Sequence, residues 1–509
     1  MELGKTAAGQ GTKVKRATLD HRGATEPREG YASPRVITPE GAVTARRFER
    51  DVLCVADGLK DVGVDAGDRV MVKGENSYAY CVALFALMHL NTSVVLVDNQ
   101  QTPEETENLA ARSAVRWRLL GEPQHRKISD GHTIAYEGFI RTCGSRSVPG
   151  SFSLARWRER EDAAILWTSG STGQPKGVVK SGRAIVDNAV CTGDATGYKP
   201  DDVLMPLLPF SHQYGFSVLL TWWVARCSLV IAPYKLIGRV VRHIATDGVT
   251  VVDATPATYH SLVGYLRKKP ETVARLSGVR MWCVGGAPLS SRIEHDFYRV
   301  LHRQLLDGYG LTELGNVAVS SPQNPVSCGP PLKGVEVCVV DEDGHRLPAD
   351  RVGEIWVSSP GLMEGYLVED GAILPQEQGW YPTEDLGYLD SAGNLHVIGR
   401  KQAVHRMGYT LYPASLERQV ELCGCTAKVV GIDDDRRGAL LFFFVEDPEE
   451  RGVRYWKDKI HRRLAPYERP NVILTMDKLP LNRNGKVDSI RLKEMAVDHA
   501  KVSTGEEGA

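Results

Sequence analysis

The stretch Thr168-Ser-Gly-Ser-Thr-Gly-Gln-Pro-Lys-Gly177 combines glycines, hydroxyl side chains and one lysine directly after the apolar run Ala163–Trp167. A strand that ends in such a loop surrounds one point with backbone N–H groups, hydroxyls and an ammonium, which suits a polyphosphate. Its glycines allow the backbone to approach phosphate oxygens closely. The stretch is not a Walker A motif, because Gly177 follows Lys176 where that motif requires Ser or Thr.

The residues before this loop alternate between strand and helix patterns. Apolar residues recur at helical spacing in 48–59, and residues 70–73, 78–90 and 93–97 read as strand, buried helix and strand. Strand, helix and strand at this spacing predict βαβ units with a parallel sheet, and hence an α/β fold. A chain of 509 residues predicts two or three domains.

The pattern changes after Gly334. Residues 335–341 and 353–358 alternate as strands and predict a small β subdomain. A polar break at 399–402 precedes a segment that predicts a compact α+β domain. Its expected elements are helices at 414–423 and 453–464 and strands at 428–432 and 439–445. The polar residues 1–30 predict a mobile tail.

Composition excludes several classes of protein. Net charge is −1, with 42% hydrophobic and 25% charged residues, so the chain is an ordinary globular protein without the basic face of a nucleic-acid binder. The longest apolar stretch, 216–233, contains Arg226 and predicts a buried helix followed by a strand rather than a membrane span. No secretory signal is visible, and the ten scattered cysteines, including the close pair Cys423 and Cys425, predict reduced thiols in a cytoplasmic protein.

The order of residues in 168–177 resembles the phosphate loop of the adenylate-forming superfamily, which includes acyl-CoA synthetases, stand-alone adenylation enzymes and luciferases. The chain matches every position of the family pattern [ST]-[SG]-G-[ST]-[TS]-G-x-P-K-G, and the resemblance extends from about Val36 to Leu492. It implies an N-terminal adenylating domain at 31–398, built of two α/β subdomains and a β subdomain. A hinge at 399–402 and a small mobile C-terminal domain at 403–509 follow.

The resemblance also implies ATP and Mg²⁺ as cofactors and assigns residues to them. In the segment 307–313, Tyr309 would stack on adenine, Thr312 would meet the α-phosphate and Glu313 would bind Mg²⁺, an ion that prefers oxygen ligands. Lys176 would steer the phosphate loop. The residues implied to contact the β- and γ-phosphates are Thr168, Ser169, Gly170, Ser171, Thr172 and Gly173; Gly286, Ala287, Asp307, Gly308 and Gly310 complete the implied nucleotide site.

Three later positions extend the resemblance. Asp385, in the segment 380–387, matches the aspartate that accepts hydrogen bonds from both ribose hydroxyls, although Glu384 replaces the usual glycine beside it. Arg400 would contact ribose or phosphate. Lys486 matches the lysine that bridges the attacking carboxylate and the α-phosphate, where fixed cations offset the charge that builds up.

The segment 209–216 resembles the part of the family that holds a gating histidine near the carboxylate, here His212. The residues predicted to line the acid pocket are Tyr214, Gly215, Phe216, Asp253, Thr255 and Gly285. The F-D-x-S motif of amino-acid adenylation domains is absent, and the aromatic and small residues favour an aryl or unsaturated acid.

The hinge departs from the family. The usual Asp or Lys is missing near Gln402, and the stretch to Gly408 is one residue short. We expect activation of a small acid as an acyl-adenylate, then transfer to a thiol, coenzyme A in the first place. An amine acceptor or an unusual oxyacid such as nitrite is the alternative. A nucleotide-binding protein that has lost catalysis is the third hypothesis.

Overall fold

A computed structural model describes most of the chain. The described residues are 34–122, 131–144, 146, 148–168, 175–287, 289, 291–341, 343–400, 404–411, 413–480 and 487–504. The predicted tail, Gln402 and Lys486 lie outside them. So do five residues predicted to contact phosphate: Ser169, Gly170, Ser171, Thr172 and Gly173. The side chain of Arg400 is also not described, so the roles predicted for all these residues stay predictions.

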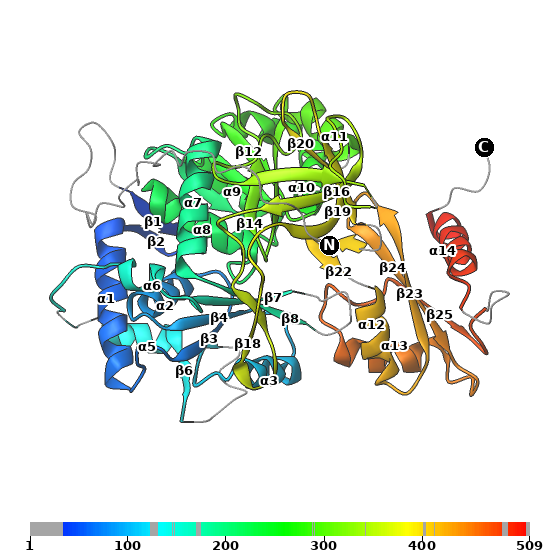
Figure 1. Ribbon diagram of the computed structural model, residues 1–509, viewed down its shortest axis with the longest axis horizontal. Helices are drawn as coiled ribbons and strands as arrows, with labels where there is room; N and C mark the ends of the chain where they lie inside the picture. Colours follow the sequence, from blue (N-terminus) through cyan, green and yellow to red (C-terminus); the bar gives the residue numbers. More distant parts are fainter. Residues whose placement is uncertain are drawn as a thin grey trace.

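Two large sheets carry the N-terminal part of the chain (Figure 1). Within the described residues, the first sheet has the order β14 (Gly315–Val319), β13 (Leu305–Leu311), β12 (Met281–Val284), β11 (Val251–Ala254), β9 (Val203–Pro206), β10 (Ser228–Val230), β1 (Arg35–Thr38), β2 (Gly41–Thr44). The second has the order β18 (Ile373–Pro375), β17 (Gly365–Leu367), β8 (Lys176–Lys180), β7 (Ala164–Thr168), β4 (Ser93–Val97), β3 (Arg69–Lys73), β5 (Trp117–Leu120), β6 (Thr133–Ala135). Strands β3 and β4 pair in parallel, as the sequence predicts.

Helices fill the space between the sheets and cover their outer faces. The N-terminal helices are α1 (Ala45–Asp61), α2 (Tyr78–His89), α3 (Pro103–Arg112), α5 (Tyr136–Cys143), α6 (Ala155–Arg158), α7 (Gly182–Thr196), α8 (Gln213–Ala225), α9 (Ile237–Thr246), α10 (Pro256–Lys268) and α11 (Ser291–Leu301), with 3₁₀ turns η1 (Pro270–Leu276) and η2 (Glu369–Gly371). The largest core joins α1, α2, α7 and α8 to strands of both sheets. Helices α9, α10 and α11 pack on the far face of the first sheet.

The sequence of α2 explains its central position. The side chain of Ser77 accepts a hydrogen bond from the N–H of Tyr80 and caps the helix. Apolar residues surround the helix on all sides, and a helix of this kind is stable only when it is buried. Nine of its residues are buried, which confirms the predicted buried helix. The stretch 216–233 likewise forms most of α8 and then β10, as predicted.

Two further parts complete the molecule. The antiparallel β subdomain consists of β15 (Glu336–Val340), β16 (Gly353–Ser358), β19 (Tyr381–Leu389) and β20 (Leu395–Arg400). The C-terminal part contains a hairpin of β21 (Val404–Arg406) and β22 (Tyr409–Leu411), a sheet of β23 (Ala427–Asp434), β24 (Gly438–Glu446) and β25 (Val472–Met476), and helices α12 (Pro413–Glu421), α13 (Gly452–Arg463) and α14 (Ser489–Thr504).

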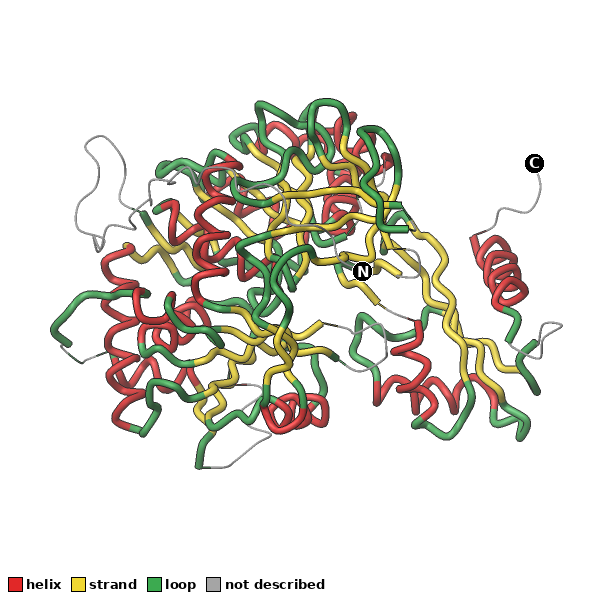
Figure 2. The backbone as a smooth tube through the Cα atoms, viewed as in Figure 1, coloured by secondary structure: helices red, strands yellow, loops and turns green. Residues whose placement is uncertain are grey.

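The C-terminal part has its own hydrophobic cores. Helices α12 and α13 pack on one face of its sheet through Leu441 and Phe443, and α14 packs on the other through Phe442 and Phe444. Figure 2 shows this three-layer arrangement beside the rest of the molecule. The domain boundaries predicted from the sequence stay a prediction, because no observation here tests them.

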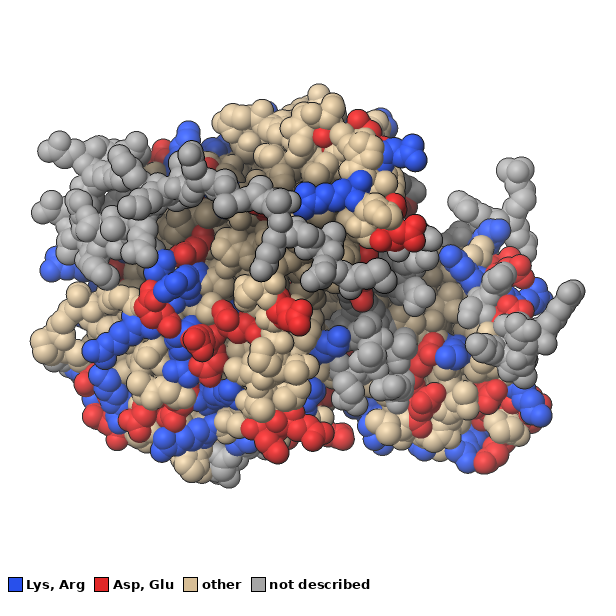
Figure 3. All heavy atoms as spheres, viewed as in Figure 1, with Lys and Arg blue, Asp and Glu red and all other residues tan. Residues whose placement is uncertain are grey.

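The surface and the thiols agree with the composition. On the face shown in Figure 3, basic and acidic side chains intermingle without a patch of one sign. No helix in the described part combines the length and apolar character that crossing a membrane requires. The ten cysteines are all free, and the neighbours Cys423 and Cys425 form no disulfide.

Candidate active site

A cleft of about 1580 Å³ opens where the two large sheets, the β subdomain and the C-terminal part meet. Most of the predicted site residues that the structure describes line it. They are Thr168, Lys176, His212, Tyr214, Gly215, Asp253, Thr255, Gly285, Gly286, Ala287, Asp307, Gly308, Tyr309, Gly310, Thr312, Glu313 and Asp385. The exception is Phe216, which is fully buried in the large core and is not part of the cleft wall.

Strands β7 and β8 fix the neck of the phosphate loop. They pair antiparallel, with Thr168 directly opposite Lys176, so the loop joins two strands and not a strand and a helix. Gly177 already belongs to β8. A Cβ there would lie 2.9 Å from the Cβ of Leu367, so this glycine allows β17 to pair closely with β8.

Tyr366 links the end of the loop to Glu313. The Lys176 ammonium lies 5.1 Å from the centre of the Tyr366 ring, and the Tyr366 hydroxyl donates to Oε1 of Glu313 at 3.2 Å. Burial is the first cause that raises the pKa of Tyr366, with the Glu313 charge next, so this hydroxyl stays a donor. Sequence reasoning missed Tyr366 because its position depends on the pairing of β17 with β8, 190 residues apart in sequence.

Tyr309 and Asp385 meet across the first sheet and the β subdomain. The Tyr309 hydroxyl donates to Oδ2 of Asp385 at 2.6 Å. The hydroxyl of Thr383 accepts from the Asp385 N–H at 3.1 Å and fixes the strand there. Asp385 is only 7% exposed and lines the cleft, where a carboxylate can accept hydrogen bonds from ligand hydroxyls.

Close backbone contacts and hydrogen bonds determine the conformation of the residues next to Tyr309 and Asp385. A register shift between Tyr309 and Gly310 bends β13, and a Cβ at Gly310 would lie 2.6 Å from the carbonyl oxygen of Gly315. Asp307 accepts from the Gly308 N–H at 2.9 Å, and burial raises the pKa of its carboxyl to about 7. Glu384 has a φ of +60°, the left-handed conformation that suits the glycine of the family pattern.

His212 pairs with Asp98, which follows β4. The Nε2 atom of His212 and Oδ2 of Asp98 are 2.7 Å apart, and the Gln100 N–H donates to Oδ1. Burial works to raise the pKa of Asp98, but the hydrogen bonds with His212 and Gln100 outweigh it, so this pKa lies below its usual range. Sequence reasoning missed Asp98; its position at the carboxyl end of a parallel strand was the available signal.

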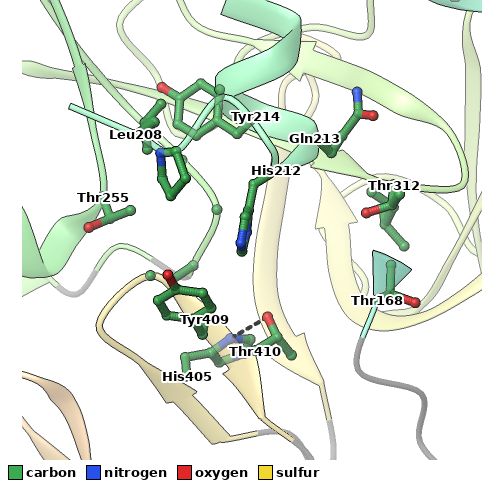
Figure 4. A pocket seen from close by; sticks show the side chains of 18 of the residues that line it. Thr168, Leu208, His212, Gln213, Tyr214, Thr255, Thr312, His405, Tyr409 and Thr410 are labelled. Carbon is green, nitrogen blue, oxygen red and sulfur yellow. Dashed lines mark hydrogen bonds between the residues drawn. The ribbon is translucent and has the colours of Figure 1, made fainter. Parts of the chain in front are cut away.

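Two of the predicted acid-pocket residues, Tyr214 and Thr255, lie near His212 in Figure 4. Thr255 caps α10, since its side chain accepts from the Thr258 N–H, and it also lines the cleft. Gly285 lies so close to Tyr214 that a Cβ would sit 3.2 Å from its ring, and Gly215 similarly packs on the carbonyl of Pro209. Asp253 is buried and accepts hydrogen bonds from two tyrosines, described below.

The β21–β22 hairpin brings the C-terminal part into the same cleft. Arg406 pairs with Tyr409, which leaves the two-residue turn Met407-Gly408 with φ values of +53° and +84°, the type I′ geometry that favours glycine. A Cβ at Gly408 would lie 2.6 Å from Thr255, so the tip approaches α10 closely. Figure 4 shows Tyr409 and His405 facing this part of the site.

Stacked tyrosines hold the hairpin against the N-terminal part. The rings of Tyr409 and Tyr467 are parallel at 3.7 Å, and Tyr409 meets His212 edge-on at 5.1 Å. Gln100 donates to the Tyr409 hydroxyl at 2.7 Å and Gln101 to the Tyr467 hydroxyl at 3.2 Å. The sequence offered no signal for these contacts.

The cleft fits a nucleotide with its metal ion. Lys176 supplies a cation for phosphate oxygens, the Glu313 carboxylate suits a hard divalent cation, and Asp385 suits ribose hydroxyls.

Comparison with known proteins agrees with this geometry. The model of the AMP-binding enzyme family matches residues 25–367, and the chain belongs to this family. It is an ATP-dependent, AMP-forming acid ligase of the adenylate-forming superfamily, with ATP and Mg²⁺ as cofactors.

Relatives and solved structures cover nearly the whole chain. 4-Coumarate–CoA ligase 5 of Oryza sativa subsp. japonica is 28% identical over 470 residues, 85% of this chain and 86% of the relative. The fold matches o-succinylbenzoate CoA synthetase from Bacillus subtilis with a TM-score of 0.76 at 24% identity, over 90% of this chain and 95% of that one. It matches an amide bond synthetase from Marinactinospora thermotolerans equally, with a TM-score of 0.76 at 22% identity, over 92% and 98%.

Proposed function

We propose that this enzyme activates a small aryl or unsaturated carboxylic acid as an acyl-adenylate and transfers the acyl group to the thiol of coenzyme A. The observation that carries the proposal is the meeting of Lys176, Thr312, Glu313 and Asp385 with His212 in one cleft. The relationship to 4-coumarate–CoA ligase 5 supports an aryl acid and a thiol acceptor.

In the first step, a carboxylate oxygen attacks the α-phosphorus of ATP and the bond to pyrophosphate breaks. Two anions approach each other, so fixed cations and donors lower the barrier more than acids or bases do. Thr312 would donate to the α-phosphate, Lys176 would hold the departing pyrophosphate and Lys486 would bridge the reacting groups. A Mg²⁺ ion bound by Glu313 would neutralise phosphate charge.

In the second step, the thiol sulfur attacks the acyl carbon, the bond to AMP breaks and the thiol proton is released to solvent. The acceptor must pass the part of the cleft that the β21–β22 hairpin lines. Tyr409 of this hairpin meets the ring of His212, which would face the acid carboxylate, and His405 also lines the cleft.

An amine acceptor is the second candidate. The fold likeness to an amide bond synthetase equals the likeness to a CoA synthetase, so the fold favours neither acceptor. The stretch that ends at Gly408 is one residue shorter than the family pattern and belongs to the hairpin that lines the proposed path of the acceptor. This departure from the family supports considering an amine acceptor.

The experiment is pyrophosphate release across a panel of acids, with and without coenzyme A, with amines in a parallel series. Release that depends on one acid, with a thioester in the presence of coenzyme A, is the expected result. An amide in its place would support the second candidate. Absence of pyrophosphate release with every acid, oxyacids such as nitrite included, would overturn adenylation and support a nucleotide-binding protein without catalysis.

A further inference from the structure

A buried carboxylate lies in the wall of the cleft without a cation beside it. Asp253, the third residue of β11, is 2% exposed and lines the cleft. The Tyr214 hydroxyl donates to its Oδ1 at 3.2 Å, and the Tyr198 hydroxyl lies 3.3 Å from its Oδ2. Among the described residues, no Lys, Arg or His forms an ion pair with it.

Several threonine hydroxyls that line the same cleft as Asp253 already donate within the protein. Thr192, Thr196 and Thr221 line the cleft, and each donates to a backbone carbonyl of its own helix. The amide of Asn316 donates to the hydroxyls of Thr192 and Ser217. The hydrogens that these groups donate are therefore not available to a ligand.

Asp253 is the strongest acceptor in this wall. An ionised carboxylate offers about four lone-pair positions, and the two tyrosines occupy about half of them. Burial raises the pKa of this carboxyl to about 7, against the lowering effect of the Tyr214 and Tyr198 hydrogen bonds. A buried carboxylate with unused acceptor positions is costly unless a donor reaches it, and an apolar ligand would add to that cost.

We propose that Asp253 selects acids that carry an amino or hydroxyl substituent, whose N–H or O–H it accepts inside the acid pocket. The inference rests on the proposed function, since it assumes that this wall holds the activated acid. Tyr198 and Tyr214 act as positioning residues, because their hydroxyls fix the orientation of the carboxylate. The acid pocket is then built for a polar aryl acid and not for an apolar chain.

The test compares matched acids in the pyrophosphate-release assay. Benzoate and cinnamate are each compared with their amino, hydroxy and methyl derivatives, because a methyl group matches the donor groups in size without donating. Wild-type kcat/KM should favour a donor-bearing acid over its methyl analogue by at least about tenfold. In Asp253→Leu that ratio should fall to about one or below, and in Tyr198→Phe it should fall less. Asp194→Asn, an exposed carboxylate of α7, should keep the wild-type ratio.

The outcomes separate the two proposals. Turnover in which wild type favours the methyl or unsubstituted acid would overturn the selection by Asp253, as would an unchanged ratio in Asp253→Leu. No pyrophosphate release from any acid, with ATP still raising the melting temperature, would instead overturn the proposed function. The rise in melting temperature with ATP also shows whether each variant is folded. If Asp253→Leu is not folded, Tyr198→Phe and Asp253→Asn are used to measure the ratio of kcat/KM for the donor-bearing acid to that for its methyl analogue.

Discussion

The cleft has two walls of different origin, one from residues 34–400 and one from residues 404–480. The first places its site residues at the ends of strands and on tight turns, as with Asp98 after β4 and Tyr309 in β13. The second lines the cleft with the β21–β22 hairpin, the stacked Tyr409–Tyr467 pair and residues of other segments of the C-terminal part. The first wall continues the sheets, whereas the second joins it through contacts between distant segments, such as Gln100 with Tyr409 and Gln101 with Tyr467.

This difference separates binding from chemistry. A wall built on sheets suits the recognition of a nucleotide, because preorganised groups lose little entropy on binding. A separate C-terminal part suits Lys486, which is predicted to act only in the adenylation step. We therefore expect substitution of a residue predicted to contact the nucleoside, such as Asp385 in the first wall, to change affinity for ATP, and substitution of Lys486 to change the rate.

Lys486→Ala has the largest expected effect; this lysine follows the residues of the second wall in the sequence, and its role is the one predicted from the family resemblance. Removing the cation that would bridge the carboxylate and the α-phosphate should lower kcat for pyrophosphate release by about 10²- to 10³-fold. The KM for ATP should change little. Lys478→Ala, an exposed lysine of the same segment, is the matched control. A large rise in KM with kcat preserved would contradict the division between the walls.

Glu468→Gln tests how the walls meet. Burial, then repulsion from Glu105 of the first wall, raises the pKa of Glu468 to about 7 from an ordinary value of 4.5. The folded protein therefore holds a proton that the unfolded chain releases between about pH 4.5 and 7, and wild-type stability falls as pH rises through that window.

The Glu468→Gln variant carries no ionisable group at this position, so it does not lose stability as the pH rises. Its free energy of unfolding should exceed that of wild type by about 3 kcal/mol at pH 8, and the difference should shrink toward pH 5. Denaturant unfolding at both pH values measures it. Asp253 and Asp307 also have raised pKa values, but they contribute the same pH dependence of stability to wild type and to Glu468→Gln. Glu421→Gln, exposed on α12, should show no such pH dependence, and a pH-independent difference in Glu468→Gln would refute the assignment.

Asp385→Asn tests the first wall. The amide keeps an oxygen for the Tyr309 hydroxyl but loses the charge and an acceptor position. We expect the KM for ATP to rise by about 10- to 100-fold, the cost of hydrogen bonds to a charged group, with kcat nearly unchanged. Asp343→Asn, in an exposed turn of the same subdomain, should match wild type. A fall in kcat at unchanged KM would show that this wall also takes part in the chemical step.

The same difference explains how much the sequence could predict. Parallel strands and the buried helix α2 follow from local patterns, because neighbouring residues encode strands and helices. The segment 307–313 is assigned by its resemblance to the family motif. The strand pairing that places Tyr366, the Gln101–Tyr467 contact and the Gln100–Tyr409 contact could not be predicted, since these partners lie far apart in the sequence and meet only when the parts assemble. Phe216 shows the opposite case: the sequence grouped it with Tyr214, but the helix turns its side chain into the core.

Glu384→Gly is the smallest test and concerns the rigidity of the first wall. Glu384 is exposed and has a φ of +60°, beside the buried Asp385. A left-handed conformation costs a non-glycine residue about 1 kcal/mol, whereas glycine adopts it freely but loses more chain entropy on folding. Because these effects oppose each other, the variant should be more stable by only a few tenths of a kcal/mol, with the KM for ATP unchanged. A decrease in stability, seen in the unfolding midpoint, would mean that the Glu384 side chain makes contacts that outweigh the strain, and a lower KM would mean that its charge repels the nucleotide.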